Sequence, residues 1–167
     1  MSELYRCGHR RIAALVSCAE DRSISQLRYQ GYVRSLADHG LPLEQELVIE
    51  AGSFDIRQAY LAVRRRLMEG ARFTALFAIS DNMAIGAMRA LREAGQQIPR
   101  DCSVIAIDGL TMSEYINPTL TTLCQPMEEM GRRSAEILLD MVRHKGSHAC
   151  ELLPTTLRQG RSVAAPR

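Results

Sequence analysis

A strong net charge is missing from this sequence. It holds 21 lysine and arginine residues against 19 aspartate and glutamate residues, which gives a formal charge of +2 at pH 7. A nearly neutral chain offers no broad basic surface for nucleic acid. The two arginine clusters, Arg64–Arg66 and Arg132–Arg133, fall within helical patterns and are expected on solvent-exposed helix faces. The composition therefore gives no sign of direct contact with DNA or RNA.

Long apolar runs are missing as well. No stretch approaches the roughly 18 apolar residues that a membrane-spanning helix needs. Residues 1–6 lack the apolar core of a signal peptide. We therefore expect a cytoplasmic protein that does not contact a membrane.

Cysteine is present but follows no pairing or metal-binding pattern. The five cysteines are odd in number and scattered along the chain, at Cys7, Cys18, Cys102, Cys124 and Cys150. They form no C-x-x-C pair, and no histidines stand at metal-ligating spacing. This pattern is typical of buried thiols in a reducing compartment, and we expect neither a metal site nor another cofactor.

The common catalytic motifs are absent too. The sequence has no G-x-G-x-x-G after its first expected strand, no phosphate-binding P-loop and no G-x-S-x-G. Asp81 and Asp108 could imitate an acid–base pair, but no nucleophile is recognisable beside them. The sequence predicts that the protein is not an enzyme.

What the sequence does contain is an alternation of short apolar strands and amphipathic helices. With 167 residues and 46% hydrophobic content, the chain can bury a core as one domain, or as one domain and part of a second. The expected strands cover residues 12–16, 47–49, 75–79, 104–107, 120–124 and a last one within 152–157, and the expected helices cover 24–39, 56–69, 82–94 and 127–144. The alternation predicts an α/β fold with a doubly wound parallel sheet.

Two of the apolar runs end on an aspartate. Asp81 follows residues 77–80, and Asp108 follows residues 104–107. Strands buried on both faces read as continuous apolar stretches, and ligands bind outside their carboxyl ends. A single aspartate there can instead cap the next helix. Two aspartates at successive strand ends favour a ligand site.

Several short strings stand in an order and spacing that match one family. They are Gly8-His9-Arg10-Arg11-Ile12-Ala13, Arg28-Tyr29-Gln30-Gly31-Tyr32, His39-Gly40-Leu41-Pro42, Thr74-Ala75-Leu76-Phe77-Ala78, Ser80-Asp81-Asn82-Met83-Ala84-Ile85-Gly86-Ala87, Ile98-Pro99, Ser103-Val104-Ile105-Ala106-Ile107-Asp108, Pro118-Thr119-Leu120-Thr121-Thr122 and Gln125-Pro126. Together they resemble the effector-binding domain of lac repressor/galactose repressor (LacI/GalR) family transcription regulators over residues 8–131, and more loosely to about Val163.

The resemblance implies a periplasmic-binding-protein-like (type I) fold, in which crossing strands join two α/β lobes. It assigns residues 1–9 to an N-terminal crossover segment, 10–120 to the distal lobe, 121–154 to a crossover and a partial proximal lobe with the helix 127–144, and 155–167 to a return strand and tail. The family's N-terminal helix-turn-helix and hinge have no counterpart here, so operator DNA is expected as a partner only through that missing domain.

The resemblance also implies ligand-binding residues. Arg28 matches the arginine of R-x-x-G-[FY], whose planar guanidinium suits bidentate contact with ligand hydroxyls or carbonyls. Asp108 matches a ligand acceptor, and the ends of the first helix and fourth strand lie at one sheet edge, so the two can converge. The remaining candidates are Ser80 and Asp81 at the neighbouring strand end, Phe54 as an aromatic that stacks on a sugar or base ring, and Arg22 in the loop after the first strand. Arg28 as a surface arginine and Asp81 as a helix cap are the alternatives.

The helix 82–94 is apolar on more than one side, which predicts burial on more than one side. In the family this helix contributes to a dimer interface, here through Met83, Ala84, Ala87, Met88 and Leu91. The alternative is a helix wholly inside one domain. Without the rest of a proximal lobe, the apolar side of the helix 127–144 should fold back on its own lobe, exchange with a partner or self-associate.

The resemblance implies the effector-binding and dimerisation portion of a transcriptional regulator, and it favours a repressor. Its expected partners are a small-molecule effector, such as a sugar or related metabolite, and a second copy of the chain. A periplasmic-type sugar-binding protein of an uptake system shares the fold and is the alternative. An effector would act by favouring one orientation of the lobes, and the sequence leaves both its identity and the sign of its effect open.

Overall fold

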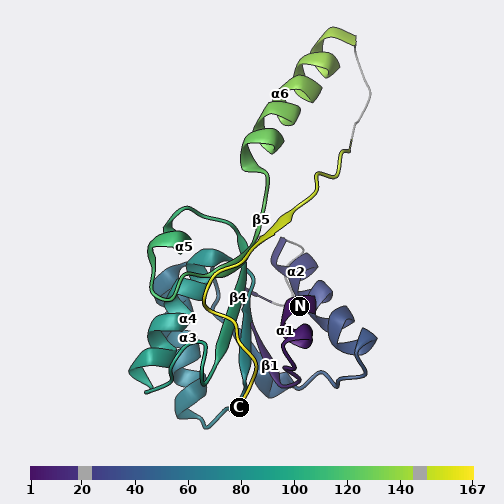
Figure 1. Ribbon diagram of the computed structural model, residues 1–167. Helices are drawn as coiled ribbons and strands as arrows, with labels where there is room; N and C mark the ends of the chain where they lie inside the picture. The colour runs from purple at the N-terminus through teal and green to yellow at the C-terminus, as the bar shows by residue number, and fades with distance from the viewer. Residues whose placement is uncertain (19–23, 145–149) are drawn as a thin grey trace.

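The computed structural model describes residues 1–18, 24–144 and 150–167. Within them a six-stranded sheet runs in the order β2-β1-β3-β4-β5-β6 (Figure 1). The strands are β1 (Ile12–Val16), β2 (Val48–Glu50), β3 (Ala75–Ala78), β4 (Ser103–Asp108), β5 (Thr121–Cys124) and β6 (Thr156–Arg158). The first five strands pair in parallel, and β6 is antiparallel to β5. The expected α/β fold is confirmed, with one antiparallel edge strand added.

Helices cover both faces of the sheet. They are α1 (Ser2–Arg6), α2 (Ile24–Asp38), α3 (Ile56–Met68), α4 (Asp81–Glu93), α5 (Met112–Tyr115) and α6 (Met127–His144), with a 3-10 turn at Gln45–Leu47. Helices α3 and α4 lie on one face, and α1 and α2 lie on the other (Figure 1). The chain moves from β1 outward to β2 and then back to β3, so the strand order reverses at β1. In such sheets ligands bind at the carboxyl ends of the strands beside this reversal.

The predicted elements agree closely with the observed ones. The strand at residues 12–16 and the helix at 127–144 have the predicted bounds, and Asp55 caps α3 by accepting the amides of Arg57 and Gln58. Helices α1 and α5 were not predicted, and α1 lies in the range expected as a crossover segment. The last strand was predicted within residues 152–157 but is shorter and later, because only Thr156–Arg158 pair with β5, whereas Leu152 lies outside the strand and is 93% exposed.

Helix α4 corrects the expected dimer interface. The five side chains assigned to that interface are each at most 1% exposed, namely Met83, Ala84, Ala87, Met88 and Leu91. Helix α4 packs against α3 on one side and against β3 and β4 on the other. Gly86 permits the close approach of α3, because a Cβ there would lie 2.2 Å from the carbonyl oxygen of Ile56. Side chains without exposed surface cannot contact a second copy, so these residues belong to the core of the chain.

The tail after β6 returns to the sheet and bonds to the amino ends of β4 and β5. The hydroxyl of Ser162 donates to the carbonyl of Val104 at 2.6 Å and accepts the amide of Thr121 at 2.9 Å. The carbonyl of Ser162 in turn accepts the amide of Val104 at 2.8 Å. One serine thus bridges two strands at their amino ends.

A buried histidine fastens the same tail. His9 is 1% exposed, with Nε2 2.8 Å from the carbonyl oxygen of Ala164 and Nδ1 2.9 Å from the hydroxyl of Thr74. A carbonyl only accepts hydrogen bonds, so Nε2 carries the proton and Nδ1 accepts from Thr74. Burial lowers the pKa of His9, which favours this neutral ring. We call the contacts of His9 and Ser162 with their neighbours the tail clasp.

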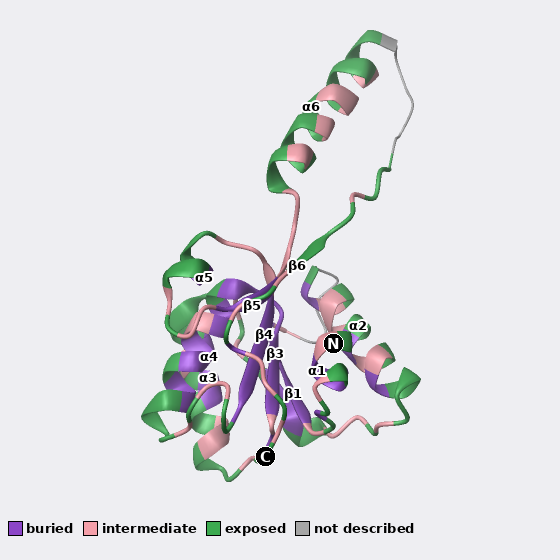
Figure 2. Ribbon diagram, in the orientation of Figure 1, coloured by how far each residue is buried: buried purple, intermediate pink, exposed green. Residues whose placement is uncertain are grey.

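Helix α6 and the chain that returns from it extend away from the sheet (Figure 2). We call residues 125–144 and 150–155 the arm. The lobe consists of residues 1–18, 24–124 and 159–167, and β6 connects the two. Large apolar side chains of the arm are exposed, among them Met127, Leu138, Leu139, Val142 and Leu152. Of the three alternatives for this helix, folding back on its own lobe is therefore excluded, and exchange with a partner or self-association stays a prediction. None of the helices in the described residues is long and apolar enough to cross a membrane.

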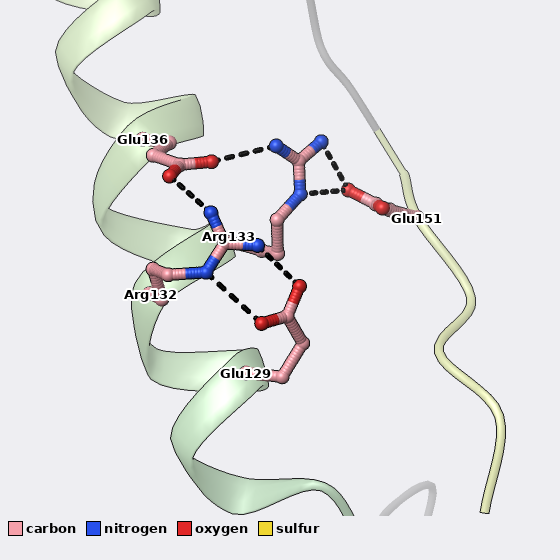
Figure 3. Close-up of polar contacts among 5 residues, drawn as sticks. All are labelled: Glu129, Arg132, Arg133, Glu136 and Glu151. Atoms are coloured by element: carbon pink, nitrogen blue, oxygen red, sulfur yellow. Dashed lines mark hydrogen bonds and ion pairs between the residues drawn. The ribbon is translucent and has the colours of Figure 1, made fainter.

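A chain of ion pairs ties α6 to the returning segment (Figure 3). Arg132 pairs with Glu129 and Glu136 on its own helix, and Arg133 pairs with Glu136 at 2.6 Å and with Glu151 across the arm at 2.6 Å. All five side chains are at least a third exposed. Water and salt weaken such pairs, so they hold the arm loosely compared with a buried face.

Candidate functional site

Arg28 and Asp108 meet at the carboxyl edge of the sheet. Arg28 projects from the second turn of α2, and Asp108 is the last residue of β4. A guanidinium nitrogen of Arg28 lies 3.1 Å from Oδ1 of Asp108, and another donates to the carbonyl of Ile79 just after β3. The two side chains are only 13% and 17% exposed. The expected convergence is present, and it joins the ends of two neighbouring strands.

The backbone at Asp108 is unusual. Its φ angle is +134°, and it is the only non-glycine residue with a positive φ among those the structure describes. Such conformations cost about 1–3 kcal/mol and persist where the surroundings enforce them, often at functional sites. The next residue, Gly109, lies against Cys124, whose Sγ would be 2.5 Å from any added Cβ. The chain therefore bends sharply here and fixes the direction of the Asp108 carboxylate.

The electrostatics of Asp108 combine two opposed effects. Burial raises the pKa of its carboxyl group, whereas the Arg28 guanidinium and the Gln125 amide lower it. A carboxylate that is half-removed from water and held by directed donors is suited to accept hydrogen bonds from ligand hydroxyls. Arg28 offers the complementary donors beside it.

Gln125 belongs to this site and was missed in the sequence. Its side-chain amide donates to Oδ1 of Asp108 at 2.7 Å, and its backbone amide donates to the Asp108 carbonyl at 3.1 Å. Gln125 follows β5 and precedes α6, so the site is bonded to the chain that leads into the arm. Gln125-Pro126 entered the sequence analysis only as one of the strings that carry the family resemblance, and nothing in that string marks the glutamine as a partner of Asp108.

Ser80 and Asp81 have structural contacts. Ser80 caps α4 by accepting the amide of Met83 at 3.2 Å, so the capping role falls to the serine and not to the aspartate. Asp81 is fully buried, and its oxygens accept the amide of Leu110 at 2.7 Å and the hydroxyl of Thr122 at 2.5 Å. Asp81 thus connects α4 to the loop after β4 and to β5.

The other two candidates stand apart from the Arg28–Asp108 pair. Phe54 follows β2 and is partly buried against the core. Three strand spacings, roughly 14 Å, separate β2 from β4 in the strand order, so one ligand would have to span that distance to reach both. Arg22 lies outside the described residues.

A cavity of about 380 Å³ reaches Arg28 from the α1 side of the sheet. Its walls include the apolar side chains of Phe77, Ile105, Leu123 and Leu157, and Asp108 is not among its lining residues. Apolar walls offer few partners to a polar ligand. The strand-end edge, where Arg28, Asp108 and Gln125 gather, is therefore the better candidate for a polar ligand site.

Residues 1–163 match the model of the periplasmic binding protein-like domain family. The chain is 35% identical over 137 residues to the HTH-type transcriptional regulator MalR of Clostridium butyricum, covering 82% of this chain and 41% of that protein. It is 36% identical over 159 residues to the HTH-type transcriptional repressor PurR of Erwinia tasmaniensis, covering 94% and 46%. The chain thus spans less than half the length of these relatives.

Solved structures show the same likeness. A sugar-binding transcriptional regulator of the LacI family from Escherichia coli, complexed with phosphate, superposes with a TM-score of 0.87 at 32% identity, covering 99% of this chain and 59% of that one. A LacI family regulator from Enterococcus faecium with bound ribose gives a TM-score of 0.83 at 32% identity, covering 97% and 59%.

Proposed function

Since the chain belongs to the periplasmic binding protein-like domain family, as an effector-binding domain of the LacI/GalR type, we propose that it is the ligand-responsive part of a transcriptional repressor. The effector that we propose is a small polar molecule, a sugar or a related metabolite. The relatives described above are transcription regulators, which favours this role over that of a sugar-binding protein of an uptake system. The role is one of binding, without a catalysed reaction, in the cytoplasm of a bacterial cell.

The observation that carries the proposal is the Arg28–Asp108 pair at the strand ends. Its two members are opposite in charge, both are mostly buried, and the backbone of Asp108 is held in a costly conformation. A structural ion pair needs no such backbone, whereas a site that must aim a carboxylate gains from it. Ligand hydroxyls can donate to Asp108 and accept from Arg28.

We further propose how the chain is divided. Residues 10–120 form the distal lobe, with 1–9 leading into it, and residues 121–154 cross to a second lobe that α6 helps to build. Residues 155–167 cross back as the return strand and tail. The exposed apolar side of α6 supports this division, because a helix with such a face is stable when another layer covers it. An effector held between the lobes would shift their relative orientation.

The partners of the whole regulator follow from the same proposal. Contact with operator DNA is assigned to a helix-turn-helix outside these 167 residues. A homodimer requires a surface other than the buried face of α4. Helix α5 offers one, because Tyr115 is 83% exposed and Met112 is 60% exposed. We place a contact between two copies there.

Calorimetric titration with a panel of pentoses, hexoses, disaccharides and purine bases tests the effector site. Asp108→Asn and Arg28→Lys should each weaken binding of the responding compound roughly tenfold to a hundredfold, as expected when a charged hydrogen-bond partner is lost. Asp140→Asn, an exposed aspartate of α6, is the matched control and should leave the affinity unchanged.

Thermal melts of the same variants separate binding from folding. If both variants bind as tightly as the parent and only melt lower, Arg28 and Asp108 are structural and the site is wrong. If a folded parent chain binds no compound of the panel, in this form and in the full-length gene product, the proposed effector class is wrong.

A further inference from the structure

Two side chains of opposite charge hydrogen-bond to the backbone of Leu110. Its amide donates to Oδ2 of Asp81 at 2.7 Å, and its carbonyl accepts from a guanidinium nitrogen of Arg158 at 2.9 Å. Asp81 belongs to α4 and Arg158 belongs to β6. Two distant parts of the chain therefore meet at one residue, two positions after Asp108.

Arg158 makes several more contacts with the same loop. It pairs with Glu114 at 2.5 Å, donates to the hydroxyl of Ser113, and lies 3.5 Å from the carbonyl oxygen of Gly109. Its side chain is 27% exposed and that of Glu114 is 52% exposed, so the ion pair lies at the rim. Ser113 is fully buried. The hydrogen bonds from Arg158 to the Ser113 hydroxyl and to the Leu110 carbonyl are therefore more shielded from water than the ion pair with Glu114. Charged donors to shielded acceptors stabilise more than surface ion pairs do.

The loop that Arg158 holds is the continuation of a strained residue. Asp108 keeps its positive φ only while its neighbours enforce it. Gln125 holds Asp108 directly, through both its side chain and its backbone. The peptide units after Asp108 are held by Asp81 and Arg158. Loss of the contacts from Arg158 would let the Gly109–Leu110 backbone rotate, and the positive φ of Asp108 could then relax.

We propose that Arg158 is a positioning residue of the effector site, which fixes the Asp108 carboxylate through Gly109 and Leu110 without touching the ligand. The inference rests on the proposed function, since it assigns a role in aiming an effector acceptor. It also connects the effector site to the arm, because Arg158 lies on β6, the strand that returns from the arm. A displacement of β6 is thereby passed to the Asp108 loop, and a change at Asp108 is passed to β6.

Amide hydrogen exchange, followed residue by residue by NMR on the ligand-free chain, tests the inference. The amide of Gln125 reports on Asp108, because it donates to the Asp108 carbonyl, and the amide of Leu110 reports on the loop. Arg158→Leu keeps an apolar stem and removes every donor. Both amides should exchange roughly tenfold to a hundredfold faster in this variant, while amides of β1 and β3 keep their rates.

Two controls make the result specific. Leu157→Ala shortens an apolar side chain of β6 at the neighbouring position and leaves the backbone pairing of β6 and the donors of Arg158 in place, so Gln125 and Leu110 should keep their protection. Arg132→Leu removes a positive charge from α6 and should also change neither amide. If Leu157→Ala accelerates the two amides as much as Arg158→Leu does, the effect belongs to the strand and the inference is wrong.

A conservative variant covers the case in which Arg158→Leu fails to fold. Arg158→Lys keeps the charge but can direct fewer donors at two carbonyls and a hydroxyl, so an intermediate acceleration is expected. Unchanged protection of Gln125 and Leu110 in Arg158→Leu, or in Arg158→Lys where only that variant folds, would overturn the inference. Because no ligand is added, this outcome is independent of whether an effector is found for the proposed function.

Discussion

The lobe and the arm both contain regular apolar patterns, but the apolar side chains are buried in the lobe and exposed in the arm. In the lobe, Leu76 of β3 is fully buried, as is most of its strand. In the arm, Leu138 of α6 is 61% exposed and Val142 is 72% exposed, although α6 has the period of an amphipathic helix. The pattern thus determines which face of an element is apolar, and the rest of the molecule determines whether that face is covered.

This difference shows what holds each region. The lobe is stabilised by apolar burial on both faces of its sheet, which salt does not screen as it screens ion pairs. The described arm is held by exposed ion pairs and by its two connections to β5 and β6. In proteins most of the stability of a helix comes from tertiary packing of its apolar face, and the apolar face of α6 is largely exposed. We therefore expect the arm to open locally at a lower free energy than the lobe.

The largest contrast is expected from leucine truncation. Leu76→Ala should lower the free energy of unfolding by about 2–5 kcal/mol, because it leaves a cavity in the core. Leu138→Ala should change it by less than about 0.5 kcal/mol, because the side chain is mostly in water. Urea titration followed by fluorescence of the lobe tyrosines measures both. Similar losses in the two variants would show that α6 is covered in solution.

Alanine in place of glycine should have opposite signs in the two regions. In α4, a Cβ on Gly86 would collide with the backbone of Ile56, so Gly86→Ala should cost about 1–3 kcal/mol. In α6, Gly131 has no atom within 4 Å of an added Cβ, so Gly131→Ala should stabilise the helix by about 0.5–1 kcal/mol. Circular dichroism during thermal unfolding reads both effects. Loss of stability in Gly131→Ala would indicate an unseen contact with this face.

The smallest effect is expected from the ion pairs of the arm. Arg133→Gln removes the bridge between Glu136 and Glu151 and should speed amide exchange in α6 a few-fold at most. High salt should reproduce that change in the parent chain, because screening at 1 M reaches down to about 3 Å. Amides of β1 and β3 should respond to neither treatment. A salt effect of the same size in those strands would contradict the division into a buried and a solvated region.

Much of the lobe could be predicted because its sequence signals are local. The strand at residues 12–16 and the helix at residues 24–39 depend on neighbouring residues, and the structure has them at Ile12–Val16 and Ile24–Asp38. The buried face of α4 was assigned to the wrong partner for the opposite reason. A helix that is apolar on more than one side indicates only that more than one side is covered, and here α3, β3 and β4 cover the residues that were assigned to a second copy.

The candidate site divides in the same way. Arg28 and Asp108 were predicted to converge because strand ends and a family motif mark them, and the structure brings them together. Gln125 and Arg158 were not found, since their importance arises from crossings between β5, β6 and the loop after β4. Ser80 and Asp81 are adjacent residues that can both cap a helix, and only the tertiary contacts of Asp81 with Leu110 and Thr122 decide between them.

The tail clasp has a consequence for synthesis on the ribosome. His9 stands just before the first strand, and its partner Ala164 is separated from it by 155 positions. A ribosome that adds about 5–20 residues per second needs several seconds or more to cover that distance. During that time the amino ends of β4 and β5 lack the serine that bridges them, and the pocket around His9 stays unfilled. The nascent lobe therefore completes its packing only after residues 162–164 have left the exit tunnel.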